Sequence, residues 1–321
     1  MTDSSTQVLT NSRMRTWREC ARKEHLSYNM RVKPKKIGDA LRFGSLVHAG
    51  LESWWKGEGL VGALAAVQVE ADPFERVKAM ALIEGYDVMW SGEEIEALEV
   101  EVEFEAPLLN PKTWAASRTW RLAGKIDAIV KMNGQTMVRE FKTTSEAIEN
   151  DGDDYWLRLA IDSQVSQYII GAEALGYQVS STLYDVARKP LLRPDMATPP
   201  DVRKYTKDGR LYANQRDRDE TPNEYYARVK TDVLSNLNYY FKRKIIPRSE
   251  EQLKDHMADV WMTARSIRDA QLLERHPRSP ESCMRYGRCP YWSCCINGED
   301  PLTSPDFEVL PGPNPELTHA V

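Results

Sequence analysis

The stretch around Asn133 and Gly134 constrains the fold of this 321-residue chain more than any other. Asn-Gly lies between two β-prone runs within residues 124–142. It favours a type I′ turn, because both central positions of that turn need a positive φ. A two-residue loop also fixes the register of the strands, so that Asp127 is expected opposite Glu140. The sequence therefore predicts a central antiparallel hairpin with two carboxylates facing each other.

This predicted carboxylate pair indicates a site for a cation. Residues directly opposite on paired strands have Cβ atoms ~4.5–5.5 Å apart, and like charges there destabilise a sheet. A divalent cation between Asp127 and Glu140 would offset the repulsion. Lys142 lies two residues after Glu140 and therefore shares its face of the strand. The alternative interpretation is a solvated charged face, because Glu-x-Lys is common on exposed strands.

Composition describes a globular protein with ample core, in one large domain or two small ones: 41% of the residues are hydrophobic and 28% are charged. No apolar run approaches the ~20 residues of a membrane span. The first residues lack the basic and apolar regions of a signal peptide. We therefore expect a cytoplasmic protein with reduced thiols and no membrane partner.

Charge is distributed unevenly along the chain. The net charge of −5 argues against a uniformly basic nucleic-acid binder. Ten basic residues nevertheless gather between Arg13 and Arg42, and a second group lies between Lys242 and Arg248. A local basic patch is what phosphate binding requires, whereas ordinary solvated charge is the alternative.

Hydrophobic periodicity predicts alternating helices and strands. We expect helices at 12–23, 41–55, 60–90 with a break near 72–73, 157–175, 221–240 and 249–274, and strands at 98–105, 118–131, 135–142, 178–187 and 245–246. A strand, a helix and a further strand favour a crossover and hence a mixed sheet. We expect a flexible N-terminus over 1–11, one domain over 12–298 with an insertion near 190–220, and a proline-rich tail over 299–321.

The five cysteines suggest a metal centre. Cys283, Cys289, Cys294 and Cys295 lie within thirteen residues, and Cys20 is far away in the sequence. Soft thiolates at such spacing favour Zn²⁺ or an iron–sulfur cluster, whereas structural thiols would be scattered. Three ligands from the C-terminal group and Cys20 would complete a site that joins the two ends of the chain. The spacing fits either metal.

Five short motifs follow one another along the chain: Gly44 to Glu52, Gly124 to Asp127, Glu140 to Lys142, Gln164 to Tyr168 and Tyr184 to Pro190. In this order, with the one-plus-three cysteine layout, they resemble the RecB-like branch of the PD-(D/E)XK nuclease superfamily. The closest resemblance is to its iron–sulfur members, such as the AddB nuclease domain, exonuclease V, the CRISPR-adaptation nucleases and phage exonucleases. This resemblance implies an α/β, restriction-endonuclease-like core with a mixed central sheet flanked by helices, and a cysteine-ligated cluster that joins the N- and C-terminal segments.

The resemblance also implies roles for individual residues. The ligands of one or two Mg²⁺ or Mn²⁺ ions would be His48, Asp127, Glu140 and the Phe141 carbonyl. Lys142 would act with Asp127 and Glu140 in catalysis, as base or water-positioning group, and Gln164 and Tyr168 would position the DNA. A [4Fe-4S] cluster, or alternatively Zn²⁺, would be held by Cys20, Cys283, Cys289 and Cys295, with Cys294 as the alternative fourth ligand.

The expected activity is that of a metal-dependent DNA exonuclease that hydrolyses phosphodiester bonds at DNA ends. It would serve recombination, repair or phage DNA processing in a bacterial, archaeal or phage-infected cell, with a recombination or single-strand-binding protein as a candidate partner. The alternatives are an endonuclease, a CRISPR-adaptation nuclease, a catalytically inactive nucleic-acid-binding module, and a zinc-stapled structural or adaptor protein.

Overall fold

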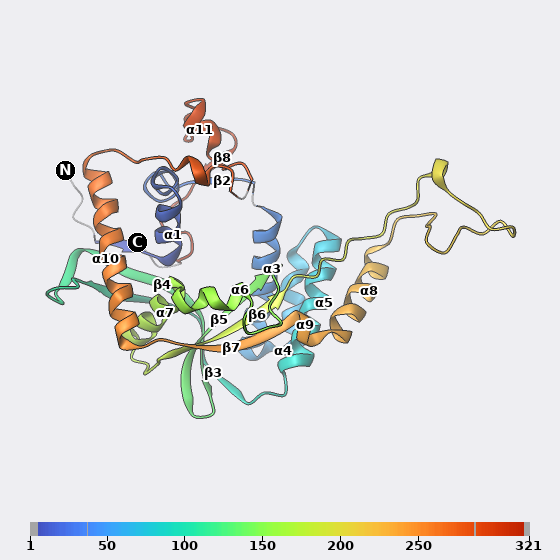
Figure 1. Cartoon of the computed structure of the whole chain (residues 1–321), viewed down its shortest axis with the longest axis horizontal. Helices are drawn as coiled ribbons and strands as arrows, with labels where there is room; N and C mark the ends of the chain where they lie inside the picture. Colours follow the sequence, from blue (N-terminus) through green and yellow to red (C-terminus); the bar gives the residue numbers. More distant parts are fainter. Residues whose placement is uncertain (1–5, 37, 286, 318–321) are drawn as a thin grey trace.

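A mixed sheet forms the centre of the protein in a computed structural model that describes residues 6–36, 38–285 and 287–317. The strand order is β1-β4-β5-β6-β7, and β3 pairs with the other edge of β4. The strands of this sheet are β1 (Gln7–Leu9), β3 (Ile95–Leu109), β4 (Ala116–Met132), β5 (Gln135–Thr144), β6 (Ser181–Arg188) and β7 (Phe241–Pro247). Helices cover the sheet on both faces, as the sequence predicted for an α/β fold (Figure 1).

The central hairpin has the predicted turn, and the predicted register holds from the turn as far as Ala128 and Arg139. Asn133 and Gly134 have φ values of 50° and 79°, as a type I′ turn requires. Met132 pairs with Gln135, and the ladder continues from there to Ala128 and its partner on β5. The turn chemistry alone therefore fixed the pairing of β4 with β5.

The predicted crossover is also present. From β5 the chain passes through α6 (Asp154–Arg158) and α7 (Ser163–Ala174) and returns as β6, parallel to β5. The single helix expected over 157–175 is divided at Asp162, because its side chain accepts the N–H groups of Gln164 and Val165 and so begins α7. Gly176, with φ 94°, follows the end of α7, where a left-handed residue commonly ends a helix.

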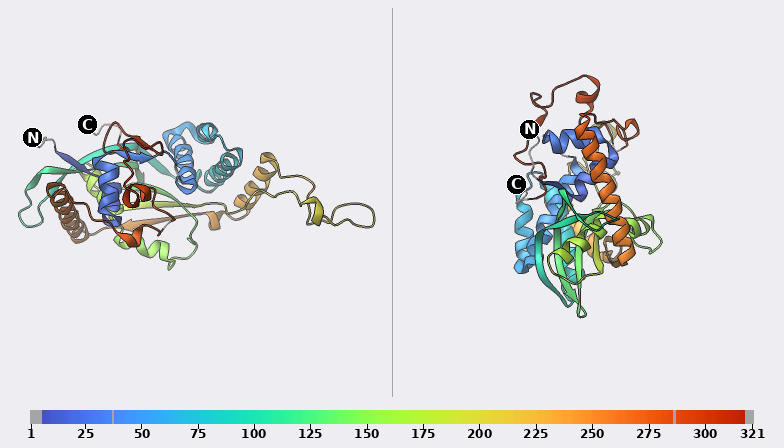
Figure 2. Two further views of the ribbon diagram at one scale, coloured as in Figure 1. Left: turned by 90° about the horizontal axis from the view of Figure 1, so that it is seen from above. Right: turned by 90° about the vertical axis from the view of Figure 1, so that its left-hand side faces the viewer.

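The two faces of the sheet carry separate cores. On one face α7 and α10 (Glu250–Leu272) pack on β3, β4 and β6. On the other face α3 (Asp39–Ser53), α5 (Pro73–Trp90) and α8 (Pro222–Ser235) pack on β4, β5 and β6, so the two groups of helices sandwich the sheet (Figure 2). Two shorter helices, α4 (Gly59–Ala66) and α9 (Leu237–Tyr240), belong to the second group.

The N- and C-terminal segments form a separate layer beside the sheet (Figure 1). It contains α1 (Asn11–Glu19), α2 (Ala21–Glu24), β2 (Val32–Pro34), α11 (Trp292–Ile296) and β8 (Phe307–Val309). The helix expected over 12–23 is interrupted at Cys20, which is extended (φ −164°), and its N-cap is Thr10. Strand β8 pairs with β2, so the stretch expected as a tail contributes a strand. Strand β1 likewise lies within the stretch expected to be flexible.

The insertion near 190–220 forms an extended arm that projects from the body between β6 and α8 (Figures 1 and 2). The helices expected from 221 and from 249 both begin with a capping box: Thr221 with Glu224 begins α8, and Ser249 with Gln252 begins α10. Within the ranges that the structure describes, no helix has the length and apolar character that crossing a bilayer would require.

Candidate active site

The two predicted carboxylates lie where β4 and β5 separate. Backbone pairing between these strands ends at Ala128 and Arg139, one residue before Asp127 and Glu140. The register prediction was therefore too strict, because Asp127 does not form a ladder pair with Glu140. Its Oδ2 instead accepts the Phe141 N–H at 2.7 Å. The edge of β4 that pairs with β5 at Ala128–Met132 pairs with β1 at Trp120–Leu122. The stretch of β4 between these two pairings leaves room for side chains.

Glu140 is the most constrained group of the site. Its side chain is 2% exposed. Oε1 accepts hydrogen bonds from the Lys142 ammonium and, at 2.9 Å, from Gln164 Nε2, whereas no described residue bonds Oε2. Burial raises the pKa of Glu140 to about 8; the charge of Asp127 adds to this rise, and Lys142 opposes it. A buried carboxylate oxygen without a partner marks a place where a cation would be stabilising.

Lys142 carries the positive charge of the site. It points to the same face as Glu140, as the two-residue spacing predicted, and its side chain is one-third exposed. Burial lowers the pKa of the ammonium, but Glu140 and Asp127 outweigh burial and raise the pKa above its ordinary value. Lys142 is therefore protonated at neutral pH in this arrangement, which suits a group that orients water or stabilises negative charge.

His48 approaches the carboxylates from α3. Its Nδ1 lies 3.9 Å from Asp127 Oδ2, and its ring packs edge-on against Phe141 with centroids 4.9 Å apart. Burial lowers the pKa of His48 against the opposing effect of Asp127, so the imidazole is neutral at pH 7. A neutral imidazole beside carboxylates is a donor set that binds divalent metals.

Helix α7 contributes the two residues expected to position DNA. Gln164 Nε2 bonds Glu140 and also lies 3.0 Å from the Tyr168 hydroxyl. Burial raises the pKa of Tyr168 well above its usual value, with the charge of Glu140 next in effect, so its hydroxyl stays protonated. Gly124 allows α7 to approach β4, because a Cβ there would lie 2.7 Å from Phe104 and 3.1 Å from Tyr168.

These residues fit a divalent metal in chemistry. One imidazole and two carboxylates, one with a free buried oxygen, match the ligands of Mg²⁺ or Mn²⁺. As the side chains stand, no three His, Cys, Asp or Glu groups of the described ranges close around a common point. At this site Asp127 accepts a hydrogen bond from the Phe141 N–H, and Glu140 accepts one from Lys142. The role of the Phe141 carbonyl stays a prediction.

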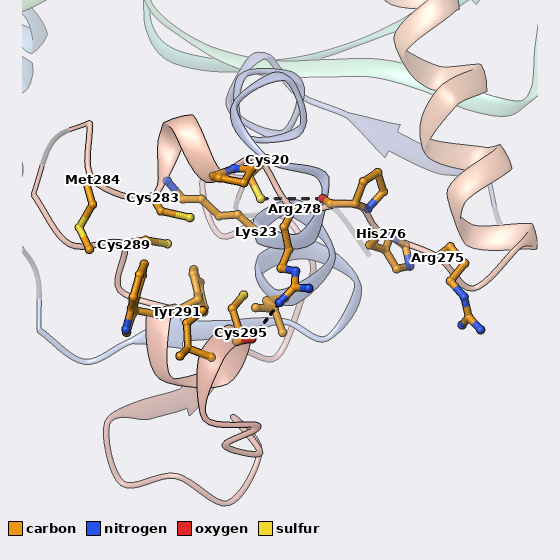
Figure 3. Close-up of a pocket in the computed structure, with 15 residues that line it drawn as sticks. Cys20, Lys23, Arg275, His276, Arg278, Cys283, Met284, Cys289, Tyr291 and Cys295 are labelled. Atoms are coloured by element: carbon orange, nitrogen blue, oxygen red, sulfur yellow. Dashed lines mark hydrogen bonds between the residues drawn. The ribbon is translucent and has the colours of Figure 1, made fainter.

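Four of the five cysteines line one pocket of about 840 Å³ between the N- and C-terminal segments (Figure 3). They are Cys20, Cys283, Cys289 and Cys295. Cys294 is buried outside this pocket, in a small core with Leu26 and Phe307, so only one member of the adjacent pair reaches the pocket. Burial raises the pKa of Cys295, and Cys20 and Cys283 lie close enough to contribute to the rise.

Protein contacts also join the two segments around this pocket. The Ser282 hydroxyl donates to the Glu19 carbonyl at 2.8 Å, and the Arg22 N–H donates to the Pro277 carbonyl at 3.0 Å. The Tyr291 hydroxyl donates to the Val32 carbonyl at 2.7 Å. The chain ends therefore meet at the pocket through direct hydrogen bonds.

Sequence reasoning missed Glu101, which lies on β3 opposite Asp127 on the neighbouring strand β4. Glu101 has φ 57°, rare for a residue other than glycine, and its carboxylate pairs with Lys125. It lines a small cavity with His48 and Asp127. The unusual backbone at Glu101 has no local signal in the sequence.

A buried charge network behind the site was also missed. Asp185 on β6 accepts hydrogen bonds from Arg139 at 2.9 Å and Arg243 at 3.0 Å, and Tyr86 bonds the same oxygen. The network joins β5, β6, β7 and α5 next to Glu140. Asp185 belongs to the Tyr184–Pro190 motif, so the sequence contained a sign of its importance but not its partners.

A family model for the PD-(D/E)XK nuclease superfamily matches residues 8–296. Among solved structures, a protein from Eubacterium rectale named "Putative exonuclease" matches 93% of this chain and 90% of its own, with 13% sequence identity and a TM-score of 0.47. No curated protein matches by sequence. The family model covers most of the chain and includes every residue of the site built above, and on this ground the chain belongs to the PD-(D/E)XK nuclease superfamily.

Proposed function

We propose that this protein is a Mg²⁺- or Mn²⁺-dependent deoxyribonuclease of the RecB-like branch that hydrolyses phosphodiester bonds at DNA ends. The observation that carries the proposal is the environment of Glu140. A buried carboxylate with one unbonded oxygen lies beside Asp127 and a lysine ammonium, in a nuclease superfamily. A divalent cation at the unbonded oxygen would stabilise the charged form of Glu140 and would suit phosphoryl chemistry.

His48, Asp127 and Glu140 would hold the ion. When bound, the ion would supply charge neutralisation on the phosphate and a lowered pKa for the attacking water. Lys142 would hold that water or a phosphate oxygen by donating hydrogen bonds, since its pKa is raised. Gln164 would keep Glu140 in place through its 2.9 Å hydrogen bond. Tyr168, half-buried at the edge of the site, would contact the DNA strand beside the scissile phosphate.

We assign action at DNA ends, in recombination, repair or phage DNA processing, because the order of the motifs resembles that of phage and repair exonucleases. An endonuclease or a CRISPR-adaptation nuclease would use the same site. An inactive binding module is disfavoured because Asp127, Glu140 and Lys142 are all present and hydrogen-bonded within the site. Glu140 accepts hydrogen bonds from Lys142 and Gln164, and Asp127 accepts one from the Phe141 N–H. A structural or adaptor protein would not need the buried Glu140.

Cys20, Cys283, Cys289 and Cys295 would hold a [4Fe-4S] cluster, with Zn²⁺ as the alternative. Their placement around one pocket supports this proposal. The role would be structural, because the pocket lies between the two chain ends and not at Glu140. The chemistry that such a cluster supplies here is cross-linking of segments distant in sequence.

The deciding experiment uses anaerobically purified protein and linear DNA labelled at the 5′ or 3′ end, single- and double-stranded, with Mg²⁺, Mn²⁺ or EDTA. Lys142→Ala is compared with Lys131→Ala, which removes an exposed lysine from the same hairpin. We expect the wild-type protein to shorten the DNA from an end when metal is present. Lys142→Ala should abolish this shortening, and Lys131→Ala should retain it. Full-length DNA in every lane, from folded protein, would overturn the proposal in favour of a binding module.

A further inference from the structure

The arm between β6 and α8 has a firmly built base. The Arg216 guanidinium lies 3.3 Å from an Asp195 carboxylate oxygen, and Arg228 bonds Glu220 at 2.7 Å. Glu220 is 4% exposed, and it also accepts the Asp195 N–H at 2.8 Å. These contacts join the outgoing and returning strands, so the arm leaves the body in a fixed direction (Figure 1).

The tip of the arm, residues 203–212, is a short hairpin. Tyr205 bridges Leu211, and the Tyr212 N–H donates to the Lys204 carbonyl at 3.1 Å. The turn between them includes Gly209, whose φ of 76° favours glycine. The tip therefore presents a short bridged turn to solvent at the greatest distance from the sheet (Figure 2).

The tip is basic in a protein that is acidic overall. Its charged residues are Arg203, Lys204, Lys207, Asp208 and Arg210, which leave a net charge of +3 (four basic minus one acidic) against −5 for the whole chain. The ion pairs found among the described residues of the arm lie at its base, and none involves Lys204, Lys207 or Arg210. Arg203 donates to main-chain carbonyls. The tip thus holds positive charge that the described protein does not neutralise.

Exposed aromatic rings lie between these cations. Tyr205 is 54% exposed and Tyr212 is 46% exposed. Because side chains alternate along a strand and opposite residues share a face, Lys204, Arg210 and Tyr212 lie on one face of the tip and Tyr205 on the other. Cations beside an exposed ring are the combination that binds single-stranded nucleic acid, through phosphate contacts and base stacking.

The arm begins next to the candidate active site. Lys142 on β5 pairs with Val186 on the parallel strand β6, and the arm begins shortly after Arg188. About fifteen extended residues then reach at most ~50 Å from that edge. A strand in a double helix, with phosphates ~3.4 Å apart along the axis, covers this distance in about fifteen nucleotides, and an extended single strand needs fewer.

We propose that the tip of the arm binds the single-stranded part of the nucleic acid that enters or leaves the active site. Tyr205 and Tyr212 stack on bases, and Lys204, Lys207 and Arg210 contact phosphates. The inference rests on the proposed function, because it assigns a second contact to the same substrate. The positive charge of Lys204, Lys207 and Arg210, which has no ion-pair partner among the described residues, favours a polyanion over a second protein.

The test measures the affinity of the full-length protein for fluorescent oligothymidylate of about 8 and about 30 nucleotides in EDTA, across a salt series. The first variant is Lys204→Ala/Lys207→Ala/Arg210→Ala. Its matched control is Lys112→Ala/Lys131→Ala/Lys254→Ala, which removes three exposed lysines from other surfaces. A second variant, Tyr205→Ala/Tyr212→Ala, removes the rings without changing the charge. Cleavage by the wild-type protein with Mn²⁺ is measured separately.

We expect the wild-type and control proteins to bind the longer strand at least about tenfold more tightly than the shorter one. Both tip variants should lose this gain in affinity for the longer strand. The charge variant should also reduce the slope of log affinity against log salt by about 2, from three lost contacts at ~0.7 each, whereas the tyrosine variant keeps the slope. The same gain and slope in wild-type and tip variants would overturn the inference. Absence of cleavage by wild-type protein would instead overturn the proposed function, and the two failures are therefore distinguishable.

Discussion

Asp127 accepts a hydrogen bond from the main-chain N–H of Phe141 at 2.7 Å, at the point where β4 and β5 stop pairing. A side-chain carboxylate therefore replaces a strand carbonyl as the partner of that N–H. The bond holds Asp127 toward the residues on both sides of Phe141, which are Glu140 and Lys142. The separation of two strands thus creates the site.

This bond separates the structural role of Asp127 from its role in catalysis. Asp127→Asn retains an oxygen that accepts the Phe141 N–H, so its melting temperature should stay near that of the wild type, whereas Asp127→Ala should lose about 1–3 kcal/mol. Both variants should lose metal-dependent cleavage. Thermal unfolding and the end-labelled DNA assay measure the two effects. Cleavage retained in Asp127→Asn would contradict the assignment of its charge as a metal ligand.

The N-cap of α7 positions Gln164 toward Glu140. Asp162→Ala should cost about 1 kcal/mol of stability and reduce cleavage about tenfold or more, because the first turn of α7 carries Gln164. Ser249→Ala removes the N-cap of α10 and serves as the matched control. It should lose similar stability and keep its cleavage rate. Equal cleavage rates in the two variants would show that the cap of α7 has no part in positioning the site.

Gly124 sets the distance between β4 and α7. Gly124→Ala should destabilise the protein by about 1–3 kcal/mol and reduce cleavage, since the added Cβ would lie 2.7 Å from Phe104 and 3.1 Å from Tyr168. Gly92→Ala is the control, because nothing lies within 4 Å of its added Cβ. Urea unfolding and the cleavage assay should change only for Gly124→Ala. An unchanged midpoint there would contradict the close packing.

The cysteine pocket allows a comparison of two adjacent residues. Cys295→Ser should lower the iron content, or the zinc content, of anaerobically purified protein, because Cys295 lines the pocket. Cys294→Ser should retain the metal, since Cys294 is buried in the small hydrophobic core with Leu26 and Phe307, outside the pocket. Metal analysis and thermal unfolding measure the outcome. Loss of metal in Cys294→Ser but not in Cys295→Ser would show that Cys294 is the ligand. Wild-type protein without iron or zinc would refute the metal cluster.

The buried network around Asp185 should make stability depend on pH. Burial raises the pKa of Asp185, but Arg243 and Arg139 outweigh it and lower the pKa below 3.8. The stabilisation is therefore fully present above about pH 4 and is lost as the pH falls through the lower folded-state pKa. At pH 7, Asp185→Asn should cost about 3–5 kcal/mol, because it leaves the buried Arg139 guanidinium without a charged partner and Arg243 with Glu93 alone.

Urea unfolding from pH 7 to about pH 2 measures this dependence. The difference in unfolding free energy between the wild type and Asp185→Asn should shrink as the pH falls below 4, because wild-type Asp185 then also loses its charge. A constant difference over the whole range would show that the carboxylate charge does not stabilise the network.

The sequence by itself determined the elements that local chemistry controls. Asn133-Gly134 specified the central turn and its register, and Thr221 and Ser249 specified two helix starts. The spacing of Glu140 and Lys142 placed both on one face. These features depend on bonds between residues close in the chain, which a sequence pattern encodes directly.

Tertiary structure decided everything that depends on how distant segments meet. It placed the unbonded oxygen of Glu140 beside Asp127, aimed Cys295 rather than Cys294 into the pocket, and gave Asp185 two arginine partners. It also decided where β4 and β5 separate, because β1 takes over the edge of β4 from another part of the chain. Burial and long-range charge set these properties, and no local pattern records either.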